Sequence, residues 1–491
     1  MKKVIAGLLS VAMIAAMAGC NKQPAQTTAG TTTKAGESKP AETTAAPAET
    51  TTSETTIKES YGEGPVHINL WSFTTEVPSM AKKYISLNPD FGKKYTVDVT
   101  VIATTNQTYQ PALDAALKNG EVDMYAAEAA FILKYTQGDA AEFAAAYKDL
   151  GIDVDKALKD AEIAPYTVDI GTRKSDNNLV ALGYQATGGA MIYRASIAKE
   201  VFGSDDAATV EKEVGGGSGK YDTFWKAAEK LKAKGYPIIS GDGDLWHMVE
   251  NSSSSGWIVD GKLNIAPERQ AFFDYSKQLV EKGWCNETTD WQPSWFADMK
   301  GVSQEGKDNK PAFCFFGPAW LINYTLAPNC GGEKAGEGTY GDWRVCKAPA
   351  GFFWGGTWVL ASKSAAENAD KKAGVATLIN WITLDASDKG LQYMWANGTF
   401  NGEGGTKDCV ASGKVMASAD GKLDFLGGQN MFPAFIAANA NATGKNMTQY
   451  DEAINGLFRE QVNQYAHGQK SIDDAIKTFK SNVADKLGVE S

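Results

Sequence analysis

Between Val66 and Glu128 the sequence repeats one pattern, in which a strand segment is followed by an amphipathic helix segment. Valines alternate with polar residues in the second strand segment, and the apolar residues from Tyr109 to Leu117 fall on one helical face. The strand segments cover 66–71, 95–102 and 122–125, and the helix segments cover 79–87 and 109–119. Such a series builds a parallel sheet with right-handed crossovers. We therefore expect an α/β fold with mostly parallel sheets flanked by helices.

The length of the chain requires more than one core. At 491 residues it exceeds what a single hydrophobic core usually holds, so two lobes are the natural expectation. The net charge of −11 argues against nucleic acid or an anionic membrane surface as a partner. No stretch after the N-terminus approaches 18 consecutive apolar residues, so no further membrane-spanning helix is predicted.

The N-terminus has the form of a secretory signal peptide. Two lysines precede an apolar run over 4–17, and Ala18-Gly19-Cys20 follows. Residues 17–20 resemble the lipoprotein box of bacteria. That resemblance implies removal of 1–19, lipid on the Cys20 sulfur, and anchoring at the outer face of the cell membrane. The alternative is an ordinary signal peptide with an incidental cysteine.

Residues 20–60 consist mainly of Thr, Ala, Pro, Glu and Lys and contain almost no large apolar side chain. Such a segment cannot bury enough surface to offset the entropy lost on ordering. We expect a disordered tether here, with a root-mean-square reach of roughly 35 Å.

Five cysteines follow Cys20, and an odd number outside the cytoplasm leaves at least one thiol unpaired. No C-x-x-C pair occurs, so the sequence does not support a zinc site. A disulfide between Cys330 and Cys346 and a set of reduced, buried thiols are both open. The five are Cys285, Cys314, Cys330, Cys346 and Cys409.

Several ordered motifs resemble the extracellular solute-binding proteins of carbohydrate ABC importers. They cover nearly all of 66–483, in the order found in that family. They are Val122-Asp123-Met124, the segment 221–232, Phe316-Gly317-Pro318-Ala319-Trp320, Gly355-Gly356-Thr357-Trp358-Val359 and the segment 468–475.

This resemblance implies two α/β lobes joined by crossing segments, with a sugar held in the cleft between them. Lobe one is predicted to hold 61–175 and 311–352, and lobe two 176–310 and 353–491. The implied partners are a carbohydrate and the transmembrane permease subunits of an importer, and the receptor itself is expected to be a monomer without a cofactor or metal.

Candidate ligand-binding residues follow from the chemistry of a sugar, which presents C–H groups on its faces and hydroxyls around its edge. Flat aromatic rings suit the faces, and carboxylates or amides suit the edge. Ligands of open α/β sheets lie beyond the carboxyl ends of the strands. The predicted residues, at such ends or in adjoining loops, are Trp71, Thr75, Glu76, Gln107, Glu128, Gln185, Asp242, Asp244, Trp246, Trp291, Trp320, Trp354 and Gly355.

Signals for catalysis are poor. The three histidines show no metal-ligand spacing, and each is interpreted as a surface or packing residue. The main alternative is a cell-surface glycoside hydrolase, which needs two carboxyl groups at a defined separation across the scissile bond. Carboxylates are plentiful, so the sequence leaves that alternative open, with a peptide-binding or adhesive lipoprotein as a minor third. Aromatic richness favours an oligosaccharide over a monosaccharide.

Overall fold

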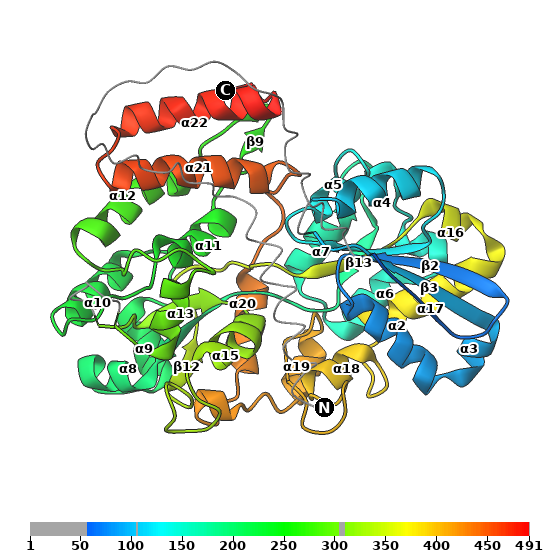
Figure 1. Cartoon of the computed structure of the whole chain (residues 1–491), viewed down its shortest axis with the longest axis horizontal. Helices are drawn as coiled ribbons and strands as arrows, with labels where there is room; N and C mark the ends of the chain where they lie inside the picture. The colour runs from blue at the N-terminus through cyan, green and yellow to red at the C-terminus, as the bar shows by residue number, and fades with distance from the viewer. Residues whose placement is uncertain (1–55, 105–106, 304–309, 491) are drawn as a thin grey trace, which may run out of the picture.

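The computed structural model describes residues 56–104, 107–303 and 310–490. Cys20, the predicted signal peptide and nearly all of the predicted tether lie outside these residues. The chain forms two α/β lobes side by side, with α20 (Phe432–Asn441) between them (Figure 1). In the described part of the chain, no helix combines the length and the apolar character needed to cross a membrane. The predicted two-lobed α/β class is confirmed.

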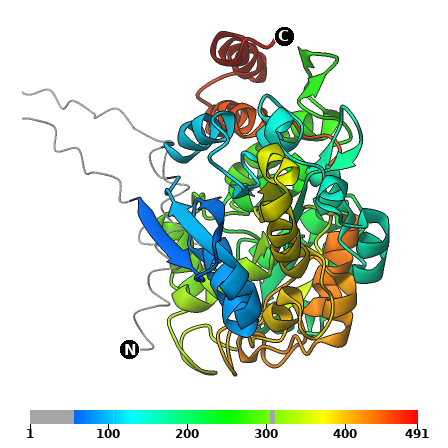
Figure 2. The same ribbon diagram turned by 90° about the vertical axis from the view of Figure 1, so that its right-hand side faces the viewer.

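Lobe one is built on a six-stranded sheet covered by helices. In sheet order the strands are β1 (Ile57–Tyr61), β3 (Tyr95–Val101), β2 (Val66–Ser72), β4 (Met124–Glu128), β13 (Thr357–Ala361) and β7 (Ala181–Gly183). The helices are α2 (Glu76–Leu87), α3 (Pro89–Lys94), α4 (Tyr109–Lys118), α5 (Ile132–Thr136), η1 (Ala141–Phe143), η2 (Tyr147–Leu150), α6 (Val154–Ala161), α7 (Pro165–Gly171), α16 (Lys363–Glu367), α17 (Ala369–Thr383), α18 (Leu391–Ala396) and α19 (Gly413–Ser418), and β5 (Thr172–Arg173) pairs with β6 (Asn178–Leu179). α17 packs against β2 and faces the viewer in Figure 2.

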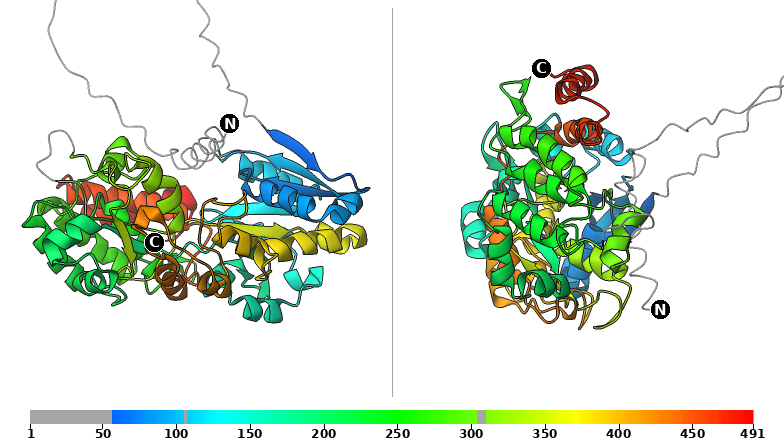
Figure 3. Two further views of the ribbon diagram at one scale, coloured as in Figure 1. Left: turned by 90° about the horizontal axis from the view of Figure 1, so that it is seen from below. Right: turned by 90° about the vertical axis from the view of Figure 1, so that its left-hand side faces the viewer.

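Lobe two is built on a smaller, three-stranded sheet in which β8 (Ala190–Arg194) lies between β11 (Cys314–Gly317) and β12 (Trp343–Cys346). Seen from below, it lies at the opposite end of the molecule from the sheet of lobe one (Figure 3, left). Its other elements are α8 (Ala195–Phe202), α9 (Ala207–Val214), α10 (Asp222–Lys232), α11 (Asp242–Ser252), β9 (Ile258–Val259), β10 (Lys262–Leu263), α12 (Pro267–Glu281), α13 (Pro293–Lys300), α14 (Ala319–Leu321), η3 (Ile322–Leu326), α15 (Ala327–Asn329), η4 (Asp424–Leu426), α21 (Asp451–Ala466) and α22 (Ile472–Leu487).

The first strands and helices form where their apolar patterns predict. The apolar stripe of α4 is buried, and the Tyr109 hydroxyl donates to the Ala126 carbonyl of β4 at 2.7 Å. β3 and β4 both pair with β2 in parallel. The carboxyl ends of these three strands therefore share one edge of the sheet.

Three details of the prediction are wrong. Parallel pairing is confined to β3-β2-β4, and the other pairs of the two main sheets are antiparallel. The predicted tether extends too far, since Ile57–Tyr61 is strand β1, paired with β3. The lobe assignment is wrong in two places. Residues 311–352 contain β11 and β12, which pair with β8 in lobe two, and the start of 353–491 contains β13, which pairs with β4 in lobe one, whereas α21 and α22 near its end lie in lobe two. An apolar strand is buried equally well in either sheet, so its sequence does not indicate which sheet it joins.

Two of the segments that carry the chain between the lobes are neighbours in space. One joins β7 to β8, and the other joins β12 to β13. They are hydrogen-bonded to each other: the Gly189 N–H donates to the Phe352 carbonyl at 2.9 Å, and the Trp354 N–H donates to the Thr187 carbonyl at 3.0 Å. This paired crossing fixes the position of Trp354 at the boundary of the lobes.

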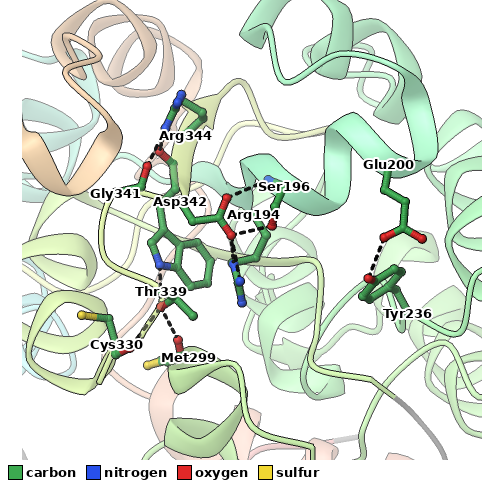
Figure 4. Close-up of polar contacts among 11 residues, drawn as sticks. Arg194, Ser196, Glu200, Tyr236, Met299, Cys330, Thr339, Gly341, Asp342 and Arg344 are labelled. Atoms are coloured by element: carbon green, nitrogen blue, oxygen red, sulfur yellow. Dashed lines mark hydrogen bonds and ion pairs between the residues drawn. The ribbon is translucent and has the colours of Figure 1, made fainter. Parts of the chain in front are cut away.

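A polar network holds α13 to the sheet of lobe two (Figure 4). Asp342 accepts from Arg194 Nε at 2.8 Å and from the Ser196 N–H at 2.7 Å. Thr339 donates from Oγ1 to the Met299 carbonyl of α13 at 2.8 Å and accepts from Trp343 Nε1 at 3.0 Å. The helix that follows Trp291 is thereby anchored at its far end.

Cys330 and Cys346 are both buried as free thiols. The alternative of a disulfide between them is wrong, and the reduced, buried alternative applies to this pair.

Candidate functional site

Three of the predicted tryptophans meet at the boundary of the lobes, and we refer to Trp291, Trp320 and Trp354 as the tryptophan cluster. The ring centroids of Trp320 and Trp354 are 4.8 Å apart with the planes at 62°, and those of Trp291 and Trp354 are 5.8 Å apart. Trp320 Nε1 donates to the Trp354 carbonyl at 3.1 Å. Trp320 is buried, whereas Trp291 and Trp354 remain half-buried. The cluster therefore keeps indole surface open to a bound molecule.

Glu128 is a residue of lobe one that lies close to this cluster. It is the last residue of β4 and pairs in register with Thr357 of β13. A Cβ atom placed on Gly355 lies 3.8 Å from Glu128 Oε1 and 3.7 Å from Trp320 Nε1. Gly355 has a φ of +70°, which glycine adopts without strain. A carboxyl group of lobe one and an indole of lobe two thus approach the same backbone position on the crossing.

The environment of Glu128 favours its protonated form. Burial and, to a smaller extent, Glu452 of α21 raise the pKa of the carboxyl to about 7, against a lowering by the Ala130 N–H. That N–H donates to Oε2 at 2.8 Å. At neutral pH the side chain is therefore divided between a form that only accepts hydrogen bonds and a form that also donates one.

A second group of polar residues lies where Glu76 begins α2. Gln185 donates from Nε2 to Asp408 Oδ2 at 2.8 Å. Burial raises the pKa of Glu76 to about 7, and burial together with the nearby Glu76 raises the pKa of Asp408 to about 7. Burial, Asp408 and Glu76 together raise the pKa of Tyr324, which belongs to η3. The predicted residues Glu76 and Gln185 are therefore brought together with two residues, Asp408 and Tyr324, that the sequence did not indicate.

His247 and Asp290 were also missed. The imidazole of His247, on α11, stacks on the Trp354 indole with ring centroids 3.7 Å apart and planes at 21°. Asp290 Oδ2 lies 3.3 Å from His247 Nε2. Burial lowers the pKa of His247, against the opposing effect of Asp290, so the imidazole is neutral at physiological pH. The interpretation of His247 as a packing residue overlooked that it packs on the cluster itself.

Two predicted site residues belong to the interior of lobe two, and their prediction is wrong. Trp246 is 2% exposed and packs against Phe272 and Phe458. Asp244 is 1% exposed and accepts from the Ser240 and Gly241 N–H groups, which caps α11. The segment interpreted as a polar strand exit is the first turn of a helix, and a helix turns these side chains inward.

The remaining predicted residues have mixed surroundings. Asp242 is half-buried and accepts from Ser276 Oγ at 2.7 Å and from Arg459 at 3.3 Å, so an internal ion pair engages it. Trp71 is half-buried beside α4, where the Tyr109 hydroxyl donates to its carbonyl at 3.4 Å. Thr75 and Gln107 are exposed and stay predictions.

Within the described residues, no three His, Cys, Asp or Glu side chains are arranged to hold a metal ion.

A protein-family model described as "Bacterial extracellular solute-binding protein" matches residues 88–422 of the chain. Among solved structures, a family 1 extracellular solute-binding protein is similar at 20% identity and a TM-score of 0.66, covering 86% of this chain and 99% of its own. The sugar-binding protein MalE of Xanthomonas citri is similar at 16% identity and a TM-score of 0.62, covering 86% and 98%.

A third similar structure is the galacto-N-biose/lacto-N-biose I-binding protein of an ABC transporter of Bifidobacterium longum, in complex with lacto-N-biose. It shares 16% identity at a TM-score of 0.59 and covers 87% of this chain and 99% of its own. No curated protein sequence matches the chain. At identities of only 16–20%, the TM-scores of 0.59–0.66 establish a shared two-lobed fold.

Proposed function

The chain belongs to the bacterial extracellular solute-binding proteins, and on that premise we propose that it is a receptor that binds an oligosaccharide and delivers it to an ABC import permease. Membership of an extracellular family implies that the protein is exported. Support for a sugar comes from similar structures of sugar-binding proteins, two of which are reported above.

The observation that carries this proposal is the meeting of Glu128 with the tryptophan cluster at the crossing. Indole faces suit the C–H faces of a sugar ring, and a carboxyl at the edge accepts from hydroxyls. The two kinds of group come from different lobes, so a molecule that touches both is held between them. The group around Glu76 and Asp408 offers further hydrogen-bonding positions for additional sugar units.

A thermal-shift screen tests the proposal. The soluble protein from residue 56 onward is heated with neutral mono-, di- and trisaccharides, with lacto-N-biose and maltose among them. A sugar at 100 times its Kd stabilises the folded protein by about 2.7 kcal/mol. We expect stabilisation by one or more oligosaccharides, and a panel without any stabilising sugar would contradict the proposal.

The glycoside-hydrolase alternative is favoured by one observation, the pKa of about 7 at Glu128, because a general acid in hydrolysis needs such a value. We propose binding without turnover. Chromatography of each oligosaccharide after prolonged incubation with the protein decides between the two: unchanged sugar supports the receptor, and smaller products that disappear in Glu128→Gln support the hydrolase.

We also propose that the receptor is anchored to the outer face of the membrane through lipid on Cys20. The proposal rests on the sequence before that residue. Cys20→Ser removes the thiol that carries the lipid, so the variant should leave the membrane fraction or remain unprocessed. A variant that is processed normally and stays with the membrane would contradict the anchor.

A further inference from the structure

We propose that Asp290 and His247 are positioning residues that set the orientation of the Trp354 indole, and with it the surface offered to the sugar. The inference rests on the proposed function and adds two residues to that site. Neither residue needs to touch the sugar. They act through Trp354, whose backbone is already held on the crossing.

The first observation is that Trp354 is held on several sides. Its N–H is bonded to the Thr187 carbonyl, and its own carbonyl accepts from Trp320 Nε1 at 3.1 Å. The remaining freedom is rotation of the indole about its side-chain bonds. His247 covers one indole face at 3.7 Å and a 21° angle, which restricts that rotation. The half-buried indole therefore presents a defined remaining surface.

The second observation is that the Asp290 carboxylate lies against the His247 ring. The two side chains are 10% and 9% exposed, and Nε2 lies 3.3 Å from Oδ2. The carboxylate sits directly over Gly243 in the first turn of α11, where an added Cβ atom lies 2.5 and 2.6 Å from the two carboxylate oxygens. Any residue larger than glycine at this position displaces the carboxylate, so the position of the Asp290 side chain depends on Gly243.

The third observation is that the backbone at Trp291 and the buried carboxylate of Asp290 are both in energetically unfavourable states. Trp291, directly after Asp290, has a φ of +67°, a left-handed conformation that is unusual for a bulky side chain. Asp290 Oδ1 is buried without a hydrogen-bond partner among the described residues. Strain and unsatisfied polar groups concentrate where geometry serves function. The strained turn places a carboxylate against His247 and an indole beside Trp354 at the same time.

A ligand-free measurement tests the positioning. The near-ultraviolet circular dichroism difference between the protein and its Trp354→Phe variant isolates the signal of a rigidly held Trp354. His247→Ala and Asp290→Ala should each remove more than half of that difference. His247→Phe should retain most of it, because a flat ring still covers the indole. His67→Ala, a change of a histidine on β2 of lobe one whose side chain is 59% exposed, is the matched control and should leave the signal unchanged.

Affinity gives the second readout, with the most stabilising sugar of the panel as the probe. We expect His247→Ala to weaken binding about fivefold to tenfold, His247→Phe to restore it to within about twofold, and the effect of His247→Ala to vanish in a Trp354→Ala background. Equal losses in both backgrounds, or an unchanged dichroism difference, would overturn the proposal. If no sugar of the panel binds, the proposed function fails, and the dichroism experiment still decides the positioning of Trp354.

Discussion

Trp354 and Trp246 are the same residue type in opposite surroundings. Trp246 lies inside lobe two, between Phe272 and Phe458, and is 2% exposed. Trp354 lies on the crossing between the lobes, covered by His247 on one face and left half-buried. The difference shows that an indole near the end of a strand pattern serves either the core or the site. What decides is whether the chain continues into a helix or crosses to the other lobe.

The largest expected effect concerns stability in the core. Trp246→Ala leaves a cavity between two phenylalanines, so we expect the free energy of unfolding to fall by about 3–5 kcal/mol. Denaturant titration of the sugar-free protein measures this loss. Affinity measured at a temperature where the variant is folded should be unchanged. A stable variant with weakened binding would reverse the roles of the two tryptophans.

The complementary change at the boundary should act mainly on affinity. Trp354→Ala removes an indole that stacks on the sugar, so binding should weaken by about 2–4 kcal/mol, as for other aromatic hot spots. Isothermal titration calorimetry with the most stabilising sugar measures it. The free energy of unfolding should fall by less than half of the Trp246→Ala loss. Intact affinity together with a large loss of stability would make Trp354 a core residue.

The sequence predicted only part of this contrast. Glu128, Trp320 and Trp354 were expected at strand ends, and the pairing of β4 with β13 brings them together. The interior position of Trp246 was missed because a short polar turn and the first turn of a helix look alike in sequence. The sequence does not indicate His247 or Asp290. His247 stacks on Trp354 and Asp290 contacts His247, and both lie on segments far from Trp354 in the sequence, so only tertiary folding creates these contacts.

A smaller effect on affinity is expected at Glu128. Glu128→Gln keeps the size of the side chain and removes the charge, so binding should weaken by about 1–2 kcal/mol. Glu121→Gln, at an exposed glutamate before β4, is the matched control. Calorimetry at pH 8, where most of the Glu128 carboxyl is ionised, gives the clearest difference. Unchanged affinity in Glu128→Gln would show that this carboxyl of lobe one does not bind the sugar.

The smallest effect is a pH dependence of stability. The pKa of Glu128 is raised to about 7 in the folded protein from a usual 4.5. The folded state therefore binds more protons than the unfolded state between these values, and its stability falls as the pH rises through about 7. Since Gln cannot ionise, Glu128→Gln should gain about 1 kcal/mol relative to the parent between pH 5 and pH 8, allowing for partial access of water. Parallel curves of unfolding free energy against pH would contradict the raised pKa.

We propose that the sugar is held between the two lobes, where Glu128 and the tryptophan cluster meet. A ligand that touches both lobes stabilises the arrangement in which they lie closest. Small-angle X-ray scattering of the soluble protein, with and without a saturating concentration of the most stabilising sugar, measures this directly. We predict a smaller radius of gyration in the loaded protein, and an unchanged radius at confirmed saturation would contradict a site between the lobes.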